Sequence, residues 1–155
     1  MKSFLLALTL GLLAGLASWF TFLTSLPTWM LFLAWTSYFL FGQNIKSTFL
    51  IFIQLLLGIL LAIIIIYLGD FLVDNLGSQW FHCSVTIVLF ATFYVTKLKV
   101  LNMLTAYFLG MVIWFASNTE LNWKEIFKVV IVLIIGFLFG WLNHNINKQI
   151  ENLTK

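Results

Sequence analysis

Arginine is absent from this chain, and cysteine and proline occur once each. Because Cys83 is the single thiol, an intrachain disulfide and a metal cluster built from cysteines are both excluded. Charged residues are also scarce, at 8% of 155 residues, and the lysines form no dense run. A phosphate backbone is bound by clustered basic side chains, so we expect no nucleic-acid partner.

Apolar residues are abundant instead, at 63% of the chain, and the mean hydropathy is +1.08. Soluble domains are about half apolar, so this composition favours a chain embedded in lipid. A membrane-spanning helix needs about 20 apolar residues, which leaves room for about six helices and no separate soluble domain. We therefore expect an all-α integral membrane protein, with one membrane domain over residues 1–155 and the lipid bilayer as a partner.

Six apolar runs separated by turn residues or lysine predict six transmembrane helices. The runs cover residues 3–23, 26–41, 47–68, 80–96, 100–115 and 123–142. The second and fifth runs are short for full spans, so these helices could be tilted, broken or re-entrant. Met1-Lys2-Ser3 resembles the start of a signal peptide, but the first run continues to Leu23 and we expect an uncleaved helix.

Lysine is distributed unevenly across this layout, and lysines near span ends are retained in the cytoplasm. Those on one side are Lys2, Lys46, Lys97, Lys99, Lys148 and Lys155. The turn that carries Asp70 and Asp74 falls on the other side, near five tryptophans, and indoles prefer that boundary. We therefore expect both termini to be cytoplasmic.

The two halves of the chain share a spacing of residues. The pattern of Lys46, Phe49 and Gly58 recurs 78 residues later, and a three-residue shift then aligns the earlier helices, pairing Trp19 with Tyr94. Repeats of three spans each, about residues 3–72 and 80–148, must lie in opposite orientations across the membrane. This predicts a 3+3 inverted repeat, an arrangement found in transporters and channels with a solute site near the midplane.

Small residues four positions apart occur on three of the expected helices. They are Gly11 and Gly15, Gly58 and Ala62, and Gly136 and Gly140. Such spacing lets two helix backbones approach closely in lipid. The contacts form either within one subunit or at the seam of a homo-oligomer, which we expect because so small a bundle exposes much apolar surface.

Polar and aromatic side chains within the spans are the candidates for a solute path. These are Trp35, Thr36, Tyr38, Gln54, Thr105 and Tyr107. Gln54 could offer its amide to a solute or to a neighbouring helix. No Asp, Glu or Arg lies deep in a predicted span, and since such groups mark proton and ion coupling, the pattern favours passive passage or none.

We expect no metal site, no cofactor and no enzymatic activity. His82 and Cys83 are adjacent, but they supply two ligands where a zinc site uses three or four. His144, the other histidine, is expected on the opposite side of the membrane. No motif places a nucleophile beside a base and an orienting acid.

The most distinctive segment is Leu-Pro-Thr-Trp at residues 26–29, followed by Phe-Leu-Ala-Trp-Thr-Ser-Tyr at residues 32–38. In these motifs, and in a six-span layout over nearly the whole chain, the sequence resembles the YcdZ-like bacterial inner-membrane proteins of unknown function. This resemblance implies a bacterial inner (cytoplasmic) membrane as the location, and it implies no substrate.

A more distant resemblance, carried by Pro27, Trp29 and Gly58, is to the membrane half of fusaric-acid-resistance and aromatic-acid exporters. Lys46 stands where those exporters have arginine, and their cytoplasmic domain has no counterpart here. We expect a passive channel or facilitator for a small neutral or weakly charged solute, such as urea, ammonia or a small organic acid. The alternatives are an accessory or assembly subunit of another membrane protein, and an organic-acid exporter-like protein.

Overall fold

The computed structural model describes residues 1–42, 44–118 and 121–153, and every element in these ranges is a helix. The predicted all-α fold is therefore confirmed for this part of the chain. The chain divides into two compact units: unit 1 comprises Met1–Thr48 and Trp123–Lys155, and unit 2 comprises Phe49–Asn122. The third helix of each half of the sequence thus packs with the first two helices of the other half.

Unit 1 contains α1 (Lys2–Thr24), α2 (Thr28–Ser37), the π-helical turn η1 (Tyr38–Gly42) and α6 (Trp123–Leu153). A left-handed residue, Ser25, ends α1 with φ at 53°. Pro27 occupies the N-cap of α2, where its missing N–H costs no hydrogen bond. The hydroxyls of Thr21 and Thr28, 2.7 Å apart, join the two helices.

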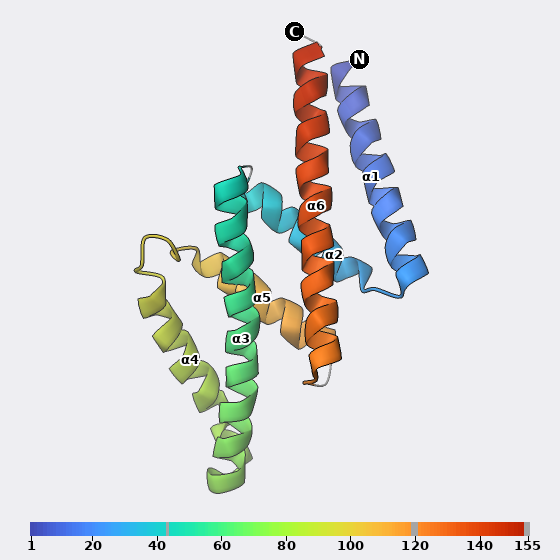
Figure 1. Cartoon of the computed structure of the whole chain (residues 1–155). Helices are drawn as coiled ribbons and strands as arrows, with labels where there is room; N and C mark the ends of the chain where they lie inside the picture. Colours follow the sequence, from blue (N-terminus) through green and yellow to red (C-terminus); the bar gives the residue numbers. More distant parts are fainter. Residues whose placement is uncertain (43, 119–120, 154–155) are drawn as a thin grey trace. The chain divides into compact units, whose positions relative to one another are not determined.

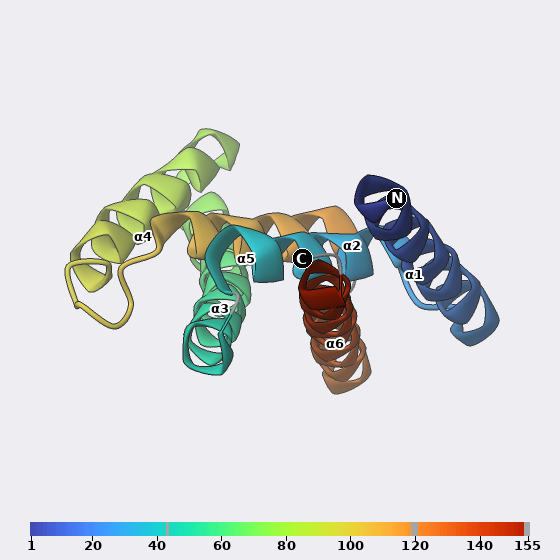
Figure 2. The same ribbon diagram turned by 90° about the horizontal axis from the view of Figure 1, so that it is seen from above.

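The start of α1 and the end of α6 lie side by side within unit 1, where Lys2 Nζ is 3.7 Å from a carboxylate oxygen of Glu151 (Figure 1). α2 is short and crosses α6 obliquely, which is also visible in the view from above (Figure 2). Unit 1 is therefore built from two long helices and one short crossing helix.

Unit 2 is built in the same way. It contains most of α3 (Ile45–Leu76), a 3-10 turn η2 (Ser78–Trp80), α4 (Phe81–Val95) and α5 (Leu104–Ser117). Gly77, with φ at +103°, permits the sharp turn between α3 and η2. The short helix α5 crosses α3 obliquely, as α2 crosses α6 in unit 1 (Figure 1).

Within the described ranges, four helical segments are long and apolar enough to span a membrane: Lys2–Thr24, Lys46–Leu76, Ser78–Val95 and Trp123–Leu153. With 10 and 14 residues, α2 and α5 extend about 15 and 21 Å, less than the apolar core of about 30 Å. The short second and fifth helices were predicted. The structure supports a membrane protein with four candidate spans, and two further full spans stay a prediction.

Hydroxyl groups inside these apolar helices mostly bond to their own backbone. Thr36, Ser37 and Thr92 each donate to the carbonyl one turn earlier, at 2.7 to 2.8 Å. In lipid, where water cannot satisfy a polar group, this local bond removes the cost of burying a hydroxyl.

Candidate functional site

In unit 1 the short helix α2 crosses α6 at two glycines. A Cβ atom on Gly136 would lie 2.5 Å from both the Ala34 Cβ and the Leu31 carbonyl oxygen. One turn later, a Cβ atom on Gly140 would lie 2.8 Å from the Cβ of Tyr38. Real Cβ atoms need more room than this, so the contact between α2 and α6 depends on glycine.

In unit 2 the short helix α5 crosses α3 in the same manner. A Cβ atom on Gly58 would overlap the backbone carbonyl of Tyr107 and lie 3.0 Å from the Cα of Gly110. Gly110 in turn faces the carbonyl of Leu55. Two backbones thus touch directly, as expected for small residues in a membrane bundle.

The two crossings use equivalent sequence positions. Each position of α2 at the crossing corresponds to the position 76 residues later in α5, one more than the 75 of the sequence alignment, and each position of α3 to the position 78 residues later in α6. The pairs are Pro27 and Met103, Leu31 and Tyr107, Ala34 and Gly110, and Gly58 and Gly136. Pro27 and Met103 are both N-caps of the short helices, so the equivalence extends from the crossing to the helix start.

Gln54 is committed to the crossing in unit 2. Its Oε1 accepts a hydrogen bond from the backbone N–H of Met103 at 2.8 Å, and its Nε2 donates to the Leu50 carbonyl at 3.1 Å. The side chain is 1% exposed, so both ends of the amide are used within the protein. Of the two roles considered for Gln54, the structure shows the bond to a neighbouring helix.

Val132 stands at the equivalent position in unit 1 and is fully buried. The N-cap of the short helix in unit 1 is Pro27, which has no N–H to satisfy. An apolar side chain on α6 is therefore sufficient in unit 1, whereas Met103 on α5 requires an acceptor. The N–H of Met103, which Pro27 lacks, accounts for an acceptor at this position in unit 2 and an apolar residue in unit 1.

A cavity of about 220 Å³ lies in unit 1 and brings together two path candidates, Trp35 and Thr36. Its other lining residues are Leu10, Ala14, Phe32 and Phe39. Trp35 is 4% exposed, and its ring stacks on Phe32 with centroids 5.8 Å apart. The ring is thus held in place against a mainly apolar hollow between α1 and α2.

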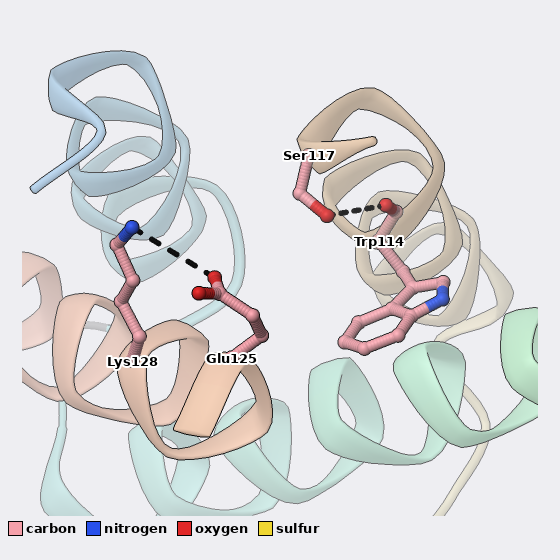
Figure 3. A network of polar contacts seen from close by, with 4 residues as sticks. All are labelled: Trp114, Ser117, Glu125 and Lys128. Atoms are coloured by element: carbon pink, nitrogen blue, oxygen red, sulfur yellow. Dashed lines mark hydrogen bonds and ion pairs between the residues drawn. The ribbon is translucent and has the colours of Figure 1, made fainter. Parts of the chain in front are cut away.

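A second cavity, of about 210 Å³, lies in unit 2. It is lined by Ile63, Ile66, Tyr67 and Asp70 of α3, by Trp114 of α5 and by Leu121. Trp114 is 3% exposed, and Ser117 Oγ donates to its carbonyl oxygen at 2.6 Å near the end of α5 (Figure 3). The sequence places Asp70 and Trp114 near the outer boundary, and Trp114 is also one of the aromatic residues that could narrow a solute path.

The remaining path candidates are dispersed. Tyr38 is buried in unit 1, where its ring centroid is 6.0 Å from that of His144 and 6.5 Å from that of Phe137. Tyr107 is buried in unit 2 and donates its hydroxyl to the Leu101 carbonyl at 3.2 Å. Thr105 is exposed. Trp35 and Thr36 are therefore the path candidates that line one of the two cavities described here.

The six candidate packing positions fall into two groups. Gly58, Ala62, Gly136 and Gly140 are buried, and the glycines among them mediate contacts within a unit. Gly11 and Gly15 are exposed, and a Cβ atom on either would meet no atom of the described chain within 4 Å. The small-residue face of α1 is thus uncovered.

Charged and metal-ligating side chains do not gather at these sites. In the described ranges no three His, Cys, Asp or Glu residues are placed to hold a metal ion. At the start of α6, Lys128 Nζ lies 3.8 Å from a carboxylate oxygen of Glu125, one turn apart on the same helix (Figure 3).

Comparison with known proteins matches residues 7–148 to the family described as "Protein of unknown function (DUF1097)". No curated protein and no solved structure gives a significant match. The family match covers both crossings and both cavities.

Proposed function

The chain belongs to the DUF1097 family of proteins of unknown function, and from this premise we propose that it is a passive channel or facilitator for a small neutral or weakly charged solute. The observation that carries the proposal is the cavity lined by Trp35 and Thr36 beside the α2–α6 crossing. A half-length helix packed on a spanning helix is how membrane proteins place irregular backbone and a solute site at membrane depth.

The duplicated crossing supports a 3+3 inverted repeat as the basis of this function. Equivalent positions of the two halves meet in the same way within each unit. Since each repeat contributes an odd number of segments, we propose that the repeats face opposite sides of the membrane, with α2 and α5 as tilted or re-entrant segments. Repeat boundaries near residues 3–72 and 80–148 stay a prediction.

We further propose a bacterial inner-membrane location with both termini in the cytoplasm. The adjacency of Lys2 and Glu151 supports placing the two ends of the chain on one side, and the lysine bias selects the cytoplasmic side. A cysteine introduced near either terminus of a Cys83→Ser chain should react with membrane-impermeant reagent only after the cells are opened. Labelling of intact spheroplasts would contradict this topology.

Flux through reconstituted liposomes tests the transport proposal. Vesicles with the purified chain should admit urea, ammonia or acetate faster than empty vesicles. Trp35→Leu should change that rate because it alters the cavity wall. Trp141→Leu is the matched control, since it makes the same change at a half-exposed position of α6. Folded protein that gives no flux above empty vesicles over a broad solute panel would refute the proposal.

A second candidate function is that of an accessory or assembly subunit, and the uncovered face of α1 favours it. Gly11 and Gly15 offer the close approach that another membrane helix requires. That helix belongs either to a second copy of the chain or to another protein. A partner that co-purifies through this face, together with an absence of flux, would support this function over transport.

The resemblances to the YcdZ-like proteins and to the aromatic-acid exporters stay predictions. An organic-acid exporter-like activity would require saturable efflux of an aromatic acid, which the same liposomes can measure. The absence of enzymatic activity and of a cofactor also stays a prediction.

A further inference from the structure

The cavity in unit 2 contains one ionisable carboxylate, that of Asp70, among otherwise uncharged side chains. The Asp70 side chain is exposed, and within the described ranges it has no ion pair or hydrogen bond. A carboxylate without a partner beside a hollow provides a fixed negative charge for a ligand. Helix packing alone would not require a carboxylate at this position.

The aromatic walls of the cavity suit a cation. Trp114 and Tyr67 lie on α5 and α3 respectively, on the same hollow as Asp70. The faces of indole and phenol rings attract ammonium ions, and tryptophan does so most strongly. Because Trp114 is almost fully buried, its ring is held by packing and needs little ordering when a ligand binds.

The remaining lining restricts the ligand to a small organic ion. Ile63, Ile66 and Leu121 supply apolar contacts, which suit alkyl groups and not a hydrated metal ion. A metal ion such as Ca²⁺ takes six to eight oxygen ligands, and one carboxylate cannot supply them. At about 210 Å³, the cavity lies below the range of about 300–1,000 Å³ typical of drug-sized ligands.

The position of Asp70 along α3 makes the cavity reachable from water. Asp70 follows Lys46 by 24 residues of one continuous helix, which corresponds to about 36 Å at 1.5 Å per residue. The apolar core is about 30 Å thick, so Asp70 lies at the opposite boundary when Lys46 lies at the first. A cation therefore reaches Asp70 without crossing hydrocarbon.

The cations of unit 2 lie away from this end. Lys97 and Lys99 follow the last turn of α4, and Lys97 Nζ stands 5.1 Å from the Tyr94 ring centroid and 5.4 Å from that of Phe93. Asp74, one turn after Asp70 on α3, adds a second negative charge to the same end. The loop with Lys97 and Lys99 follows the far end of α4, whereas the end of α3 that carries the two aspartates adjoins the start of α4 (Figure 1).

We propose that the cavity lined by Asp70, Trp114 and Tyr67 is a binding site for a small alkylammonium ion. Asp70 supplies the counter-charge, the two aromatic rings contact the charged head, and the isoleucines and Leu121 contact the alkyl groups. This goes beyond the proposed transport function, because the ion binds here whether or not the bundle conducts it.

The test is calorimetric titration of the full chain in lipid nanodiscs with tetramethylammonium chloride. Binding should saturate, and tert-butyl alcohol, a neutral molecule of similar shape, should bind at least about tenfold more weakly. Asp70→Asn should weaken tetramethylammonium binding at least about tenfold, because it removes the charge with little change of shape. Asp74→Asn, the same change one turn away and outside the cavity, should weaken it less than about threefold.

Trp114 provides an independent arm of the test. Trp114→Leu should weaken binding, and Trp114→Phe should retain more of it than Trp114→Leu, since phenylalanine keeps an aromatic face. Circular dichroism verifies that each variant is folded. The proposal is overturned if no saturable binding occurs, if Asp70→Asn and Asp74→Asn weaken binding equally, or if the alcohol binds as tightly as the ion. Binding without flux would support this site and refute transport, and flux without binding would do the reverse, so the two proposals can fail separately.

Discussion

The crossing of α2 with α6 in unit 1 and the crossing of α5 with α3 in unit 2 use equivalent positions with different side chains. At the centre both crossings require glycine on the long helix, because a backbone atom or a Cβ atom of the short helix occupies the space that a further Cβ would need. At the helix start, Met103 of unit 2 donates its N–H to Gln54, whereas unit 1 has Pro27 as the N-cap and a buried Val132 at the position equivalent to Gln54. Close packing is thus common to the two units, and the polar chemistry is not.

The difference grows toward the ends of the long helices. Tyr38 and His144 are in ring contact in unit 1, and the equivalent positions in unit 2 hold Trp114 and Ile66, which line a cavity. One turn further along the long helix, Lys148 of α6 corresponds to Asp70 of α3. The two long helices thus carry opposite charges, lysine on α6 and aspartate on α3, at equivalent positions. A membrane with a positive-inside bias favours such a difference if the two ends lie on opposite sides.

The largest expected effect comes from adding one methyl group at the tightest contact. Gly58→Ala should destabilise the folded state by about 2–3 kcal/mol, because the new Cβ overlaps backbone atoms of α5 that cannot rotate away. Gly140→Ala should cost less, since its nearest atoms, the Cβ and Cγ of Tyr38 at 2.8 Å, are overlapped less than the Tyr107 carbonyl is by a Cβ on Gly58. Equilibrium unfolding in mixed micelles, followed by circular dichroism, measures both.

Gly15→Ala is the control for this comparison. No atom within 4 Å opposes the added methyl group, and alanine is the better helix former by up to about 1 kcal/mol. Its stability should therefore be unchanged or raised. Equal losses in Gly58→Ala and Gly15→Ala would show that the α3–α5 contact is not the cause.

The next effect concerns the helix starts. Gln54→Val should cost about 1–2 kcal/mol, since it leaves the Met103 N–H without its acceptor in an apolar setting. Met103→Pro removes that N–H, so the double variant, which copies Pro27 and Val132 of unit 1, should recover most of the loss. Met103 and Pro27 are the N-caps of their short helices, with φ at −90° and −70° respectively.

A double-mutant cycle measures this coupling directly. Additive losses from Gln54→Val and Met103→Pro would mean that the two residues do not depend on each other, and the equivalence of the two helix starts would then lose its energetic basis. Unfolding curves for the four proteins, recorded in one detergent, are sufficient.

Much of the crossing could be predicted from the sequence, because close backbone contact demands small residues at fixed positions. Gly58, Ala62, Gly136 and Gly140 were identified from spacing alone, and all four are buried. The short second and fifth helices also follow from the lengths of the apolar runs. What spacing could not reveal is which helices pack together, and α3 and α6 exchange their places between the two halves.

The register of the first helices was also beyond the sequence. The sequence alignment paired Trp19 with Tyr94, whereas the buried stripes end at Thr21 in α1 and at Thr92 in α4, which is one helical turn out of step. In lipid, apolar residues are equally suited to the core and the outside, so hydropathy does not indicate the buried face. Asp70 was likewise assigned to a turn from its charge, although α3 continues to Leu76.

A smaller effect is expected at Tyr107, which occupies the position of Leu31. Its hydroxyl bond to the Leu101 carbonyl is long, at 3.2 Å, so Tyr107→Phe should cost less than about 1 kcal/mol. Tyr67→Phe, at a largely exposed tyrosine of α3, is the matched control and should leave the unfolding free energy unchanged. A loss of several kcal/mol at Tyr107 would mean that the hydroxyl has a further role.

The smallest effect on folding is expected on α1, whose small-residue face is exposed in unit 1. Gly11→Leu with Gly15→Leu should leave the unfolding free energy of one chain unchanged or raise it, because both positions are open and leucine is a better helix former than glycine. It should nevertheless shift a homo-oligomer toward monomer in sedimentation equilibrium, because leucine keeps two backbones apart. Ala91→Leu, at an exposed alanine of α4 in unit 2, should not. If Ala91→Leu dissociates the oligomer equally, or if the double α1 variant leaves it intact, the uncovered face of unit 1 is not where copies of the chain meet.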